Sequence, residues 1–262
     1  MKIFRSHFTE KESDITIISD SKNAILRAKE AFYYHRNNLE KFLLENNDFL
    51  ISFSPVKVKT DLKIINLMAN AAGICNVGPM ATVAGAFADL MLESMKLKDE
   101  NDFIPVKIAL VENGGEIAIE SEKPMKIALY AGFNELNLNL GFLIKKHDCP
   151  IGIATSSATI GHAISLGQAD VVTIFAENAT LADGAATAIG NLVKGNDIEG
   201  SIKKGLDAVN DVDGVFGALI YREGKIGQIG KIPQLIKIEG NTTKILKEKI
   251  EDYFPNDFEF IK

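Results

Sequence analysis

The stretch from residue 169 to residue 191 places a buried strand directly before a helix made of small residues. Val171 to Phe175 is a short run of β-branched and aromatic residues, which is typical of a buried strand. From Ala179 the composition changes to alanine and leucine, which favour a helix. Asn178 or Thr180 can cap its start, because their side-chain oxygens accept hydrogen bonds from the first turn. The stretch therefore predicts a strand and a helix around which the rest of the chain packs.

Asp183 and Thr187 are hard oxygen donors on a helix that otherwise consists of small residues. Because they are spaced as i and i+4, both side chains leave the same helix face one turn apart. A carboxylate and a hydroxyl on one face suit Mg²⁺, which keeps waters and substrate phosphates as its other ligands. The same pair also fits a structural role, with the aspartate interacting with the helix dipole and the threonine in the core. Asp183 and Thr187 are thus candidate metal ligands, with the structural interpretation left open.

A second small-residue segment, residues 72–89, predicts a turn followed by a helix. Gly78-Pro79 stands at the turn, and proline suits the first turn of a helix because the N–H that it lacks has no partner there. The free N–H groups of such a helix start can bind a phosphate, which makes Gly78 a candidate cofactor-binding residue. A close contact between two helices explains the same composition equally well. The chain has neither a GxGxxG nor a Walker A pattern.

A glycine-containing turn, Asn113-Gly114-Gly115, lies between two runs of alternating apolar residues and predicts a β-hairpin. Such a glycine turn lets the backbone approach a ligand closely. The asparagine and the glycines can equally serve the turn alone.

A polar loop follows a short apolar strand and leads to His162. The hydroxyl groups at its start make Thr155 and Ser156 candidate binding residues, and His162 is the candidate catalytic residue. A lone histidine of this kind as often only satisfies a structural hydrogen bond. No GxSxG nucleophile elbow is present, so these residues do not indicate a hydrolase triad. We expect His162 to lie in one pocket with Asp183, Thr187 and Asn113.

The predicted strands come mostly as adjacent pairs, with helices grouped between them. This order predicts an α+β fold with antiparallel sheets packed with central helices, and not alternating βαβ units. A long helix is expected from Ser21 to about Asn46, and a strand over residues 49–58. Residues 126–130 and 136–144 are expected to extend the sheet. We expect a single domain over residues 1–262, with room for a small N-terminal subdomain.

The charge balance limits the kinds of partner that the protein can bind. With 29 basic and 35 acidic residues the net charge is −6, which argues against a general nucleic-acid surface. The longest apolar run, Met80 to Ala88, is too short to span a bilayer, so we expect no membrane partner. The charged N-terminus and the two cysteines, which form no disulfide framework, predict a reducing cytoplasm. A homodimer is left open.

Several of these segments together resemble the ApbE superfamily, the flavin-binding group that includes FAD:protein FMN transferases, and especially its cytoplasmic branch in archaea and bacteria. Residues 182–188, Ala-Asp-Gly-Ala-Ala-Thr-Ala, are similar to the family's Ala-Asp-Ala-Leu-(Ala/Ser)-Thr-Ala helix. In the family the aspartate and threonine bind magnesium, which implies the same role for Asp183 and Thr187. Residues 113–116, Asn-Gly-Gly-Glu, look like the family's Asn-x-Gly-Gly-(Asp/Glu) turn, one residue shorter. This match implies that Asn113, Gly114, Gly115 and Glu116 bind the cofactor. Residues 78–89 resemble its glycine-rich helix start that ends in an aspartate.

Ala154-Thr155-Ser156 and His162 also resemble the family's Ala-(Thr/Ser)-Ser segment and the histidine that follows it. The resemblance covers about residues 70–192 and implies an ApbE-like, tunnel-fold-related α+β fold, with Mg²⁺ and FAD as ligands. The chain departs from the family in three places. No lysine precedes Gly85, no Asp-Pro follows His162, and the N-terminal Met-Gly-Thr motif is missing.

Two classes of function fit this pattern. The first is a Mg²⁺-dependent enzyme that transfers FMN from FAD or cleaves the diphosphate of a flavin or nucleotide, with the cation neutralising the diphosphate. The second is a non-catalytic protein that binds a flavin or another metabolite. The Asp183 and Thr187 pair favours the enzyme, whereas the missing lysine and Asp-Pro favour the binding protein.

Overall fold

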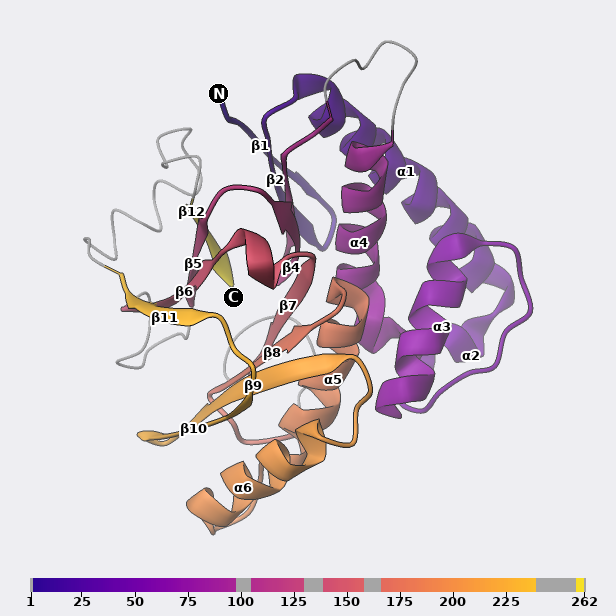
Figure 1. Cartoon of the computed structure of the whole chain (residues 1–262). Coiled ribbons are helices and arrows are strands. Elements are labelled where there is room, and N and C mark those ends of the chain that lie inside the picture. The colour runs from indigo at the N-terminus through magenta and orange to yellow at the C-terminus, as the bar shows by residue number, and fades with distance from the viewer. Residues whose placement is uncertain (1, 98–104, 130–138, 158–165, 239–257, 262) are drawn as a thin grey trace.

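The computed structural model describes residues 2–97, 105–129, 139–157, 166–238 and 258–261 (Figure 1). Its main sheet has eight strands in the order β1-β2-β3-β4-β7-β8-β9-β10, and all neighbours in it are antiparallel. The strands are β1 (Phe4–Glu10), β2 (Ser13–Ser19), β3 (Ile108–Asn113), β4 (Glu116–Ser121), β7 (Ile151–Ser156), β8 (Val171–Ala176), β9 (Val215–Arg222) and β10 (Lys225–Gly230). The antiparallel sheet confirms the α+β class and excludes alternating βαβ units.

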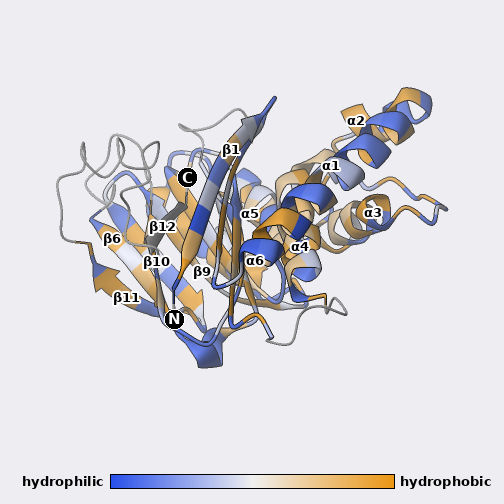
Figure 2. Ribbon diagram, turned by 90° about the horizontal axis from the view of Figure 1, so that it is seen from above, coloured by the Kyte–Doolittle hydropathy of each residue, from blue (hydrophilic) through white to orange (hydrophobic). Residues whose placement is uncertain are grey.

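A second, smaller sheet covers one face of the main sheet (Figure 2). Its order is β11-β6-β5-β12, with β5 (Met125–Leu129), β6 (Leu140–Ile144), β11 (Gln234–Lys237) and β12 (Phe258–Ile261). β12 pairs with β5 in parallel, whereas the other neighbours in this sheet are antiparallel. The expectation that residues 126–130 and 136–144 extend the main sheet is therefore wrong. Both edges of β4 are already paired, with β3 and β7, so the chain after β4 builds a separate layer.

The helices cover the opposite face of the main sheet (Figure 1). They are α1 (Lys22–Glu45), α2 (Asn47–Ile51), α3 (Lys63–Cys75), η1 (Pro79–Thr82), α4 (Val83–Lys96), α5 (Ala179–Leu192) and α6 (Ile198–Val209), and η2 (Lys146–Asp148) precedes β7. Among the described residues no single helix is long and apolar enough to cross a membrane; only α3 taken together with η1 and α4, bent by 101°, would pass on length and composition.

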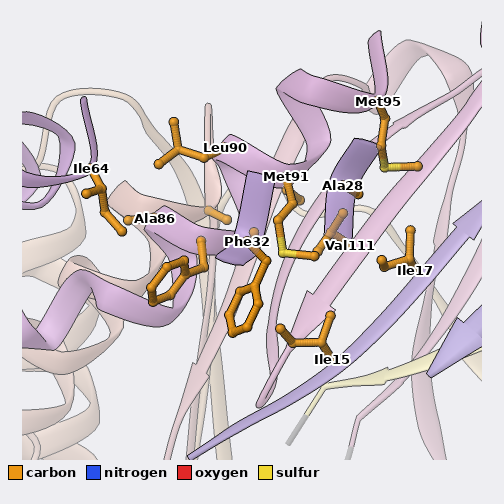
Figure 3. Close-up of a cluster of buried hydrophobic side chains, with 14 of the residues drawn as sticks. Ile15, Ile17, Ala28, Phe32, Ile64, Ala86, Leu90, Met91, Met95 and Val111 are labelled. Carbon is orange, nitrogen blue, oxygen red and sulfur yellow. The ribbon is translucent and has the colours of Figure 1, made fainter. Parts of the chain in front are cut away.

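Apolar side chains from α1, α4 and the first strands form one core cluster (Figure 3). Figure 3 shows Phe32 of α1, Met91 of α4 and Ile15 of β2 pointing toward one another, and all three are fully buried. The ring of Phe32 also lies 5.1 Å from that of Phe87, measured between centroids. The expected helix from Ser21 to about Asn46 is present as α1, with Ser21 as its cap. This packing fixes α4 between α1 and the sheet.

The strand expected over residues 49–58 is wrong. The chain forms the short helix α2 there and then continues without regular structure to the start of α3. Phe49 is the buried residue of α2, and its ring lies 5.3 Å from that of Phe42, near the end of α1. The apolar run therefore anchors a helical turn against α1 through one side chain, and Pro55 has no N–H to donate to a strand ladder.

The two small-residue helices, α4 and α5, approach each other more closely than larger side chains would allow. A Cβ atom built on Gly85 of α4 would lie 2.2 Å from the carbonyl oxygen of Ala179 in α5. A Cβ atom built on Gly152 of β7 would lie 2.2 Å from the backbone nitrogen of the same residue. The start of α5 is thus held directly against the backbone of both α4 and the sheet. The segments 79–94 and 179–190 lie largely in the interior, as their composition indicated.

Gly85→Ala should lower the free energy of unfolding by about 3 kcal/mol, because the added methyl group meets backbone atoms that cannot move aside as a side chain can. Gly73→Ala is the matched control. Gly73 is also helical, a Cβ built there meets nothing within 4 Å, and alanine should stabilise α3 by up to about 1 kcal/mol. Urea unfolding of the two variants measures both effects. Equal effects in the two variants would contradict the close contact between α4 and α5.

Candidate functional site

The Asp183 carboxylate lies at the start of a neighbouring helix. Its Oδ2 atom accepts a hydrogen bond of 3.0 Å from the backbone N–H of Gly85, in the first turn of α4. N–H groups in the first turn of a helix have no partner within the helix, and a carboxylate there also interacts favourably with the helix dipole. Asp183 is partly buried, because α5 packs against α4 and the sheet. Asp183 thus has the structural role that the sequence left open, an interaction with a helix dipole. The dipole is that of α4 and not that of its own helix, α5.

A second carboxylate, Asp89 of α4, makes the reverse contact. Its Oδ1 accepts the N–H of Ala179 at 2.9 Å, and its Oδ2 accepts the N–H of Thr180 at 2.7 Å and the hydroxyl of Thr180 at 2.5 Å. These donors belong to the first turn of α5, where the side chain of Asn178 also accepts the N–H of Leu181. Each of the two helices therefore supplies a carboxylate to the start of the other.

Asp89 is the residue that the sequence analysis missed as a member of the site. A signal for it exists, since Asp89 is the only charged residue between Lys63 and Glu93. Asp183 is likewise the only charged residue between Glu177 and Lys194. An isolated carboxylate in a long apolar segment must find donors or a cation when that segment is buried. The sequence therefore allows the hypothesis that these two carboxylates belong to one site, but it does not predict which residues they contact.

The environment of both carboxylates disfavours their charged form. Burial raises the pKa of Asp183 to about 7, against the lowering effect of the N–H groups of Gly85 and Ala84, and the charge of Asp89 adds to the rise. Burial also raises the pKa of Asp89, although the hydrogen bonds from the start of α5 lower it in part. No basic side chain is among the described groups that shift these two pKa values. A cation beside Asp183 would supply the missing positive charge.

Asn113, at the end of β3, reaches the same turn of α4. Its side-chain amide donates a hydrogen bond of 3.2 Å to the carbonyl oxygen of Ala84, the residue before the partner of Asp183. Asn113 is buried, and the next two residues, Gly114 and Gly115, have φ angles of 69° and 119°. Only glycine adopts such angles readily, and they close the hairpin between β3 and β4. The structure thus brings the predicted glycine turn and the predicted cation ligand to one helix start, with Glu116 following as the first residue of β4.

Thr155 and Ser156 point to opposite faces of β7. Thr155 lies on the face that packs against the second sheet, and its hydroxyl is 2.9 Å from that of Thr173. Ser156 lies on the face of α5, where its Oγ would be 3.5 Å from a Cβ built on Gly190. Of these two candidates, only Ser156 faces α5, and it meets that helix at Gly190, about two turns after Asp183. Thr187 lies between Asp183 and Gly190 in sequence and is partly buried.

Gly78 sits against the backbone that follows α2, since a Cβ there would lie 1.8 Å from the carbonyl oxygen of Ser52. The lack of a side chain at Gly78 therefore allows the chain before η1 to pack closely against this backbone. His162 lies outside the described residues, so its predicted place in the pocket stays a prediction. The described residue Leu166, after it in sequence, donates its N–H to Oδ1 of Asn191 at 2.9 Å, at the end of α5.

A hollow of about 410 Å³ borders Asp89 on the side of α3 and β4. Both lysines that line it are paired with glutamates, Lys63 with Glu93 and Lys96 with Glu120. Asp89 and Glu177 also line the hollow, so its acidic side chains outnumber the two lysines. Asp89 therefore belongs both to the contact between α4 and α5 and to the wall of this hollow.

The residues present could bind a divalent cation weakly, through few protein ligands. The described residues contain no group of three or more histidine, cysteine, aspartate or glutamate side chains that could hold a metal by themselves. Asp183 offers a carboxylate that lacks a basic partner in the described part, and Thr187 offers a hydroxyl one turn away. Mg²⁺ commonly binds through one or two protein oxygens and completes its shell with waters and phosphates. Cys75 is unsuited to this role, because burial, together with the charge of Asp183, raises the pKa of its thiol to about 12.

The family model described as "AbpE bacteria" matches residues 2–213. The chain belongs to this family. It is 42% identical over 242 residues to a UPF0280 protein of Methanococcus maripaludis, covering 91% of this chain and 95% of the relative. It is 38% identical over 243 residues to a UPF0280 protein of Methanocaldococcus jannaschii, covering 92% of this chain and 96% of the relative. The protein is thus an ApbE-like superfamily member, as the sequence motifs indicated.

Solved structures of the superfamily share the fold. The flavinyl transferase ApbE of Pseudomonas stutzeri, in its apo form, superposes with a TM-score of 0.53 at 15% identity, covering 87% of this chain and 94% of that one. The ApbE protein of Thermotoga maritima superposes with a TM-score of 0.50 at 16% identity, covering 93% and 99%. At these identities the likeness establishes the ApbE-like α+β fold.

The stability of the metal-free protein should fall as pH rises from about 4 to 8. The pKa of Asp183 is raised to about 7 in the folded state, above the value of about 3.9 in an unfolded chain, so over this range the folded state holds a proton that the unfolded chain has lost. Asp183→Asn keeps an oxygen for the N–H of Gly85 but cannot ionise. Urea unfolding with EDTA should therefore show a decline in the wild type that exceeds that in the variant by roughly 2 to 4 kcal/mol. Parallel pH profiles would show that burial does not disfavour the charge of Asp183.

Proposed function

We propose that this protein is a Mg²⁺-dependent enzyme that acts on the diphosphate of FAD, transferring FMN or cleaving the diphosphate. The observation that carries the proposal is the pair of partly buried carboxylates, Asp183 and Asp89, at the contact of α4 and α5 without a described basic partner. Such a charge arrangement favours a divalent cation, and a cation held by few protein oxygens leaves positions for phosphate oxygens. The flavinyl transferase named among the structural neighbours gives the class of substrate.

Each residue of the site has a definite part in this proposal. Asp183 and Thr187 would hold Mg²⁺, which when bound neutralises charge on the diphosphate. Asn113 fixes the turn at Gly114 and Gly115 against Ala84, so that the turn's backbone can approach a ligand at the start of α4. In a transfer, an acceptor hydroxyl attacks the phosphorus atom on the FMN side of the diphosphate. The bridging P–O bond then breaks, AMP leaves, and the hydroxyl proton passes to a base. His162, outside the described residues, is the catalytic candidate from the sequence, where it could orient or protonate the ligand.

A second candidate function is binding of a flavin nucleotide without transfer. It is favoured by the absence of a basic side chain among the described groups that act on Asp183, since a lysine or arginine would help to stabilise charge on a leaving phosphate. The residue before Gly85, where the superfamily motif has a lysine, is Ala84. In this case the same residues would bind Mg²⁺ and the diphosphate, and the ligand would stay intact.

Incubation with FAD and MgCl₂, followed by chromatography and mass spectrometry, separates the two functions. The enzyme releases AMP and leaves FMN either free or attached to an acceptor, whereas the binding protein retains intact FAD. Asp183→Asn should reduce Mg²⁺-dependent FAD binding or turnover at least about tenfold, because it removes the charged ligand. Asp197→Asn is the matched control, since Asp197 also accepts a first-turn N–H, that of Gly200 in α6, at 2.9 Å. Equal results for both variants, or no binding of FAD by the wild type, would contradict the proposal.

A further inference from the structure

Asp89 makes more hydrogen bonds to the helix of the candidate cation site than any simple cap requires. Its two oxygens accept two consecutive backbone N–H groups and one hydroxyl, all from Ala179 and Thr180. The first turn of α5 already has a cap of its own sequence, because the side chain of Asn178 accepts the N–H of Leu181. Asp89 therefore does more than cap the helix, because its hydrogen bonds also join the first turn of α5 to the middle of α4.

The two carboxylate contacts work in opposite directions between the same helices. Asp183 extends from α5 to Gly85 near the start of α4, and Asp89 extends from α4 to the start of α5. Of the two carboxylates, only Asp183 is a candidate cation ligand. Asp183 would have to serve both Gly85 and a bound cation, whereas the contacts of Asp89 hold α5 against α4 without involving the cation.

We infer that Asp89 is a positioning residue for the cation site: by holding the first turn of α5, it fixes Asp183 and Thr187 relative to α4 and the turn at Asn113. The inference rests on the proposed function, since it gives the site a supporting residue outside the ligand set. Residues that orient metal ligands commonly change metal affinity by about 10- to 100-fold when they are replaced.

The contact requires a carboxylate and not only a polar side chain of the same shape. All three partners of Asp89 are donors, so both of its oxygens must accept. The amide of an asparagine has one accepting oxygen and an NH₂ group that would face a backbone N–H, donor against donor. Asp89→Asn therefore removes a contact of α5 without removing volume, and it leaves both Asp183 and Thr187 in the chain.

The test measures affinity for Mn²⁺, which shares the preference of Mg²⁺ for oxygen ligands and has an EPR signal in water that is lost on binding to protein. Asp89→Asn should raise the dissociation constant for Mn²⁺ about 10- to 100-fold. Thr180→Val, which removes only the hydroxyl donor to Asp89, should raise it by a smaller factor, and Thr180→Ser, which keeps the hydroxyl, should restore the wild-type value. A residue with a purely structural role would not show this dependence on one hydroxyl group.

Asn178→Ala is the matched control for helix stability, because it removes the other cap of the same first turn. It should lower the melting temperature, as Asp89→Asn does, yet change the Mn²⁺ dissociation constant less than about threefold. Equal losses of affinity in Asn178→Ala and Asp89→Asn would overturn the inference, as would unchanged affinity in Asp89→Asn. If the wild type binds no Mn²⁺, or if Asp183→Asn binds as well as the wild type, the proposed function itself fails. Binding that depends on Asp183 but not on Asp89 refutes the positioning role alone.

Discussion

The structure depends on a reciprocal exchange of hydrogen bonds between two buried helix starts. The first N–H groups of any helix have no partner within it, and burying them unpaired costs free energy. Asp183 supplies an acceptor to α4 and Asp89 supplies three acceptor contacts to α5, so each helix satisfies the start of the other. Gly85 makes the exchange geometrically possible, because only a residue without a side chain lets the two backbones come this close.

This solution leaves two negative charges near each other in a partly buried place. Hydrogen bonds from helix starts offset the loss of hydration only in part, and burial still raises the pKa of both carboxylates. The other acidic side chain of α4, that of Glu93, is paired with Lys63. The contact between α4 and α5 thus holds two carboxylates with no basic side chain among the described groups that shift their pKa values, and this connects the fold to a cation-dependent function.

The two sheets and the outer helices make this contact rigid. The main sheet supports α4 and α5 on one face, and the smaller sheet closes its other face, so that β3 and β7 are buried on both sides. Asn113 then ties the turn after β3 to Ala84, next to the residue that contacts Asp183. The candidate ligands Asp183 and Thr187 therefore lie on a helix that is packed against α4 and the main sheet.

The sequence by itself determined the class of fold, most of the elements and the family, because these depend on local periodicity, turn residues and short motifs. The hairpin at Asn113 to Gly115 and the strand and helix of residues 171–192 are local features of this kind. Tertiary structure alone decided that residues 125–129 and 140–144 belong to a second sheet, since strand pairing depends on which edges are already occupied. It also decided the partner of Asp183 and the role of Asp89. Asp183 is 98 positions from Gly85, and Asp89 is 90 positions from Ala179. No local pattern predicts a hydrogen bond over such a separation, and only the packing of α4 against α5 brings the partners together.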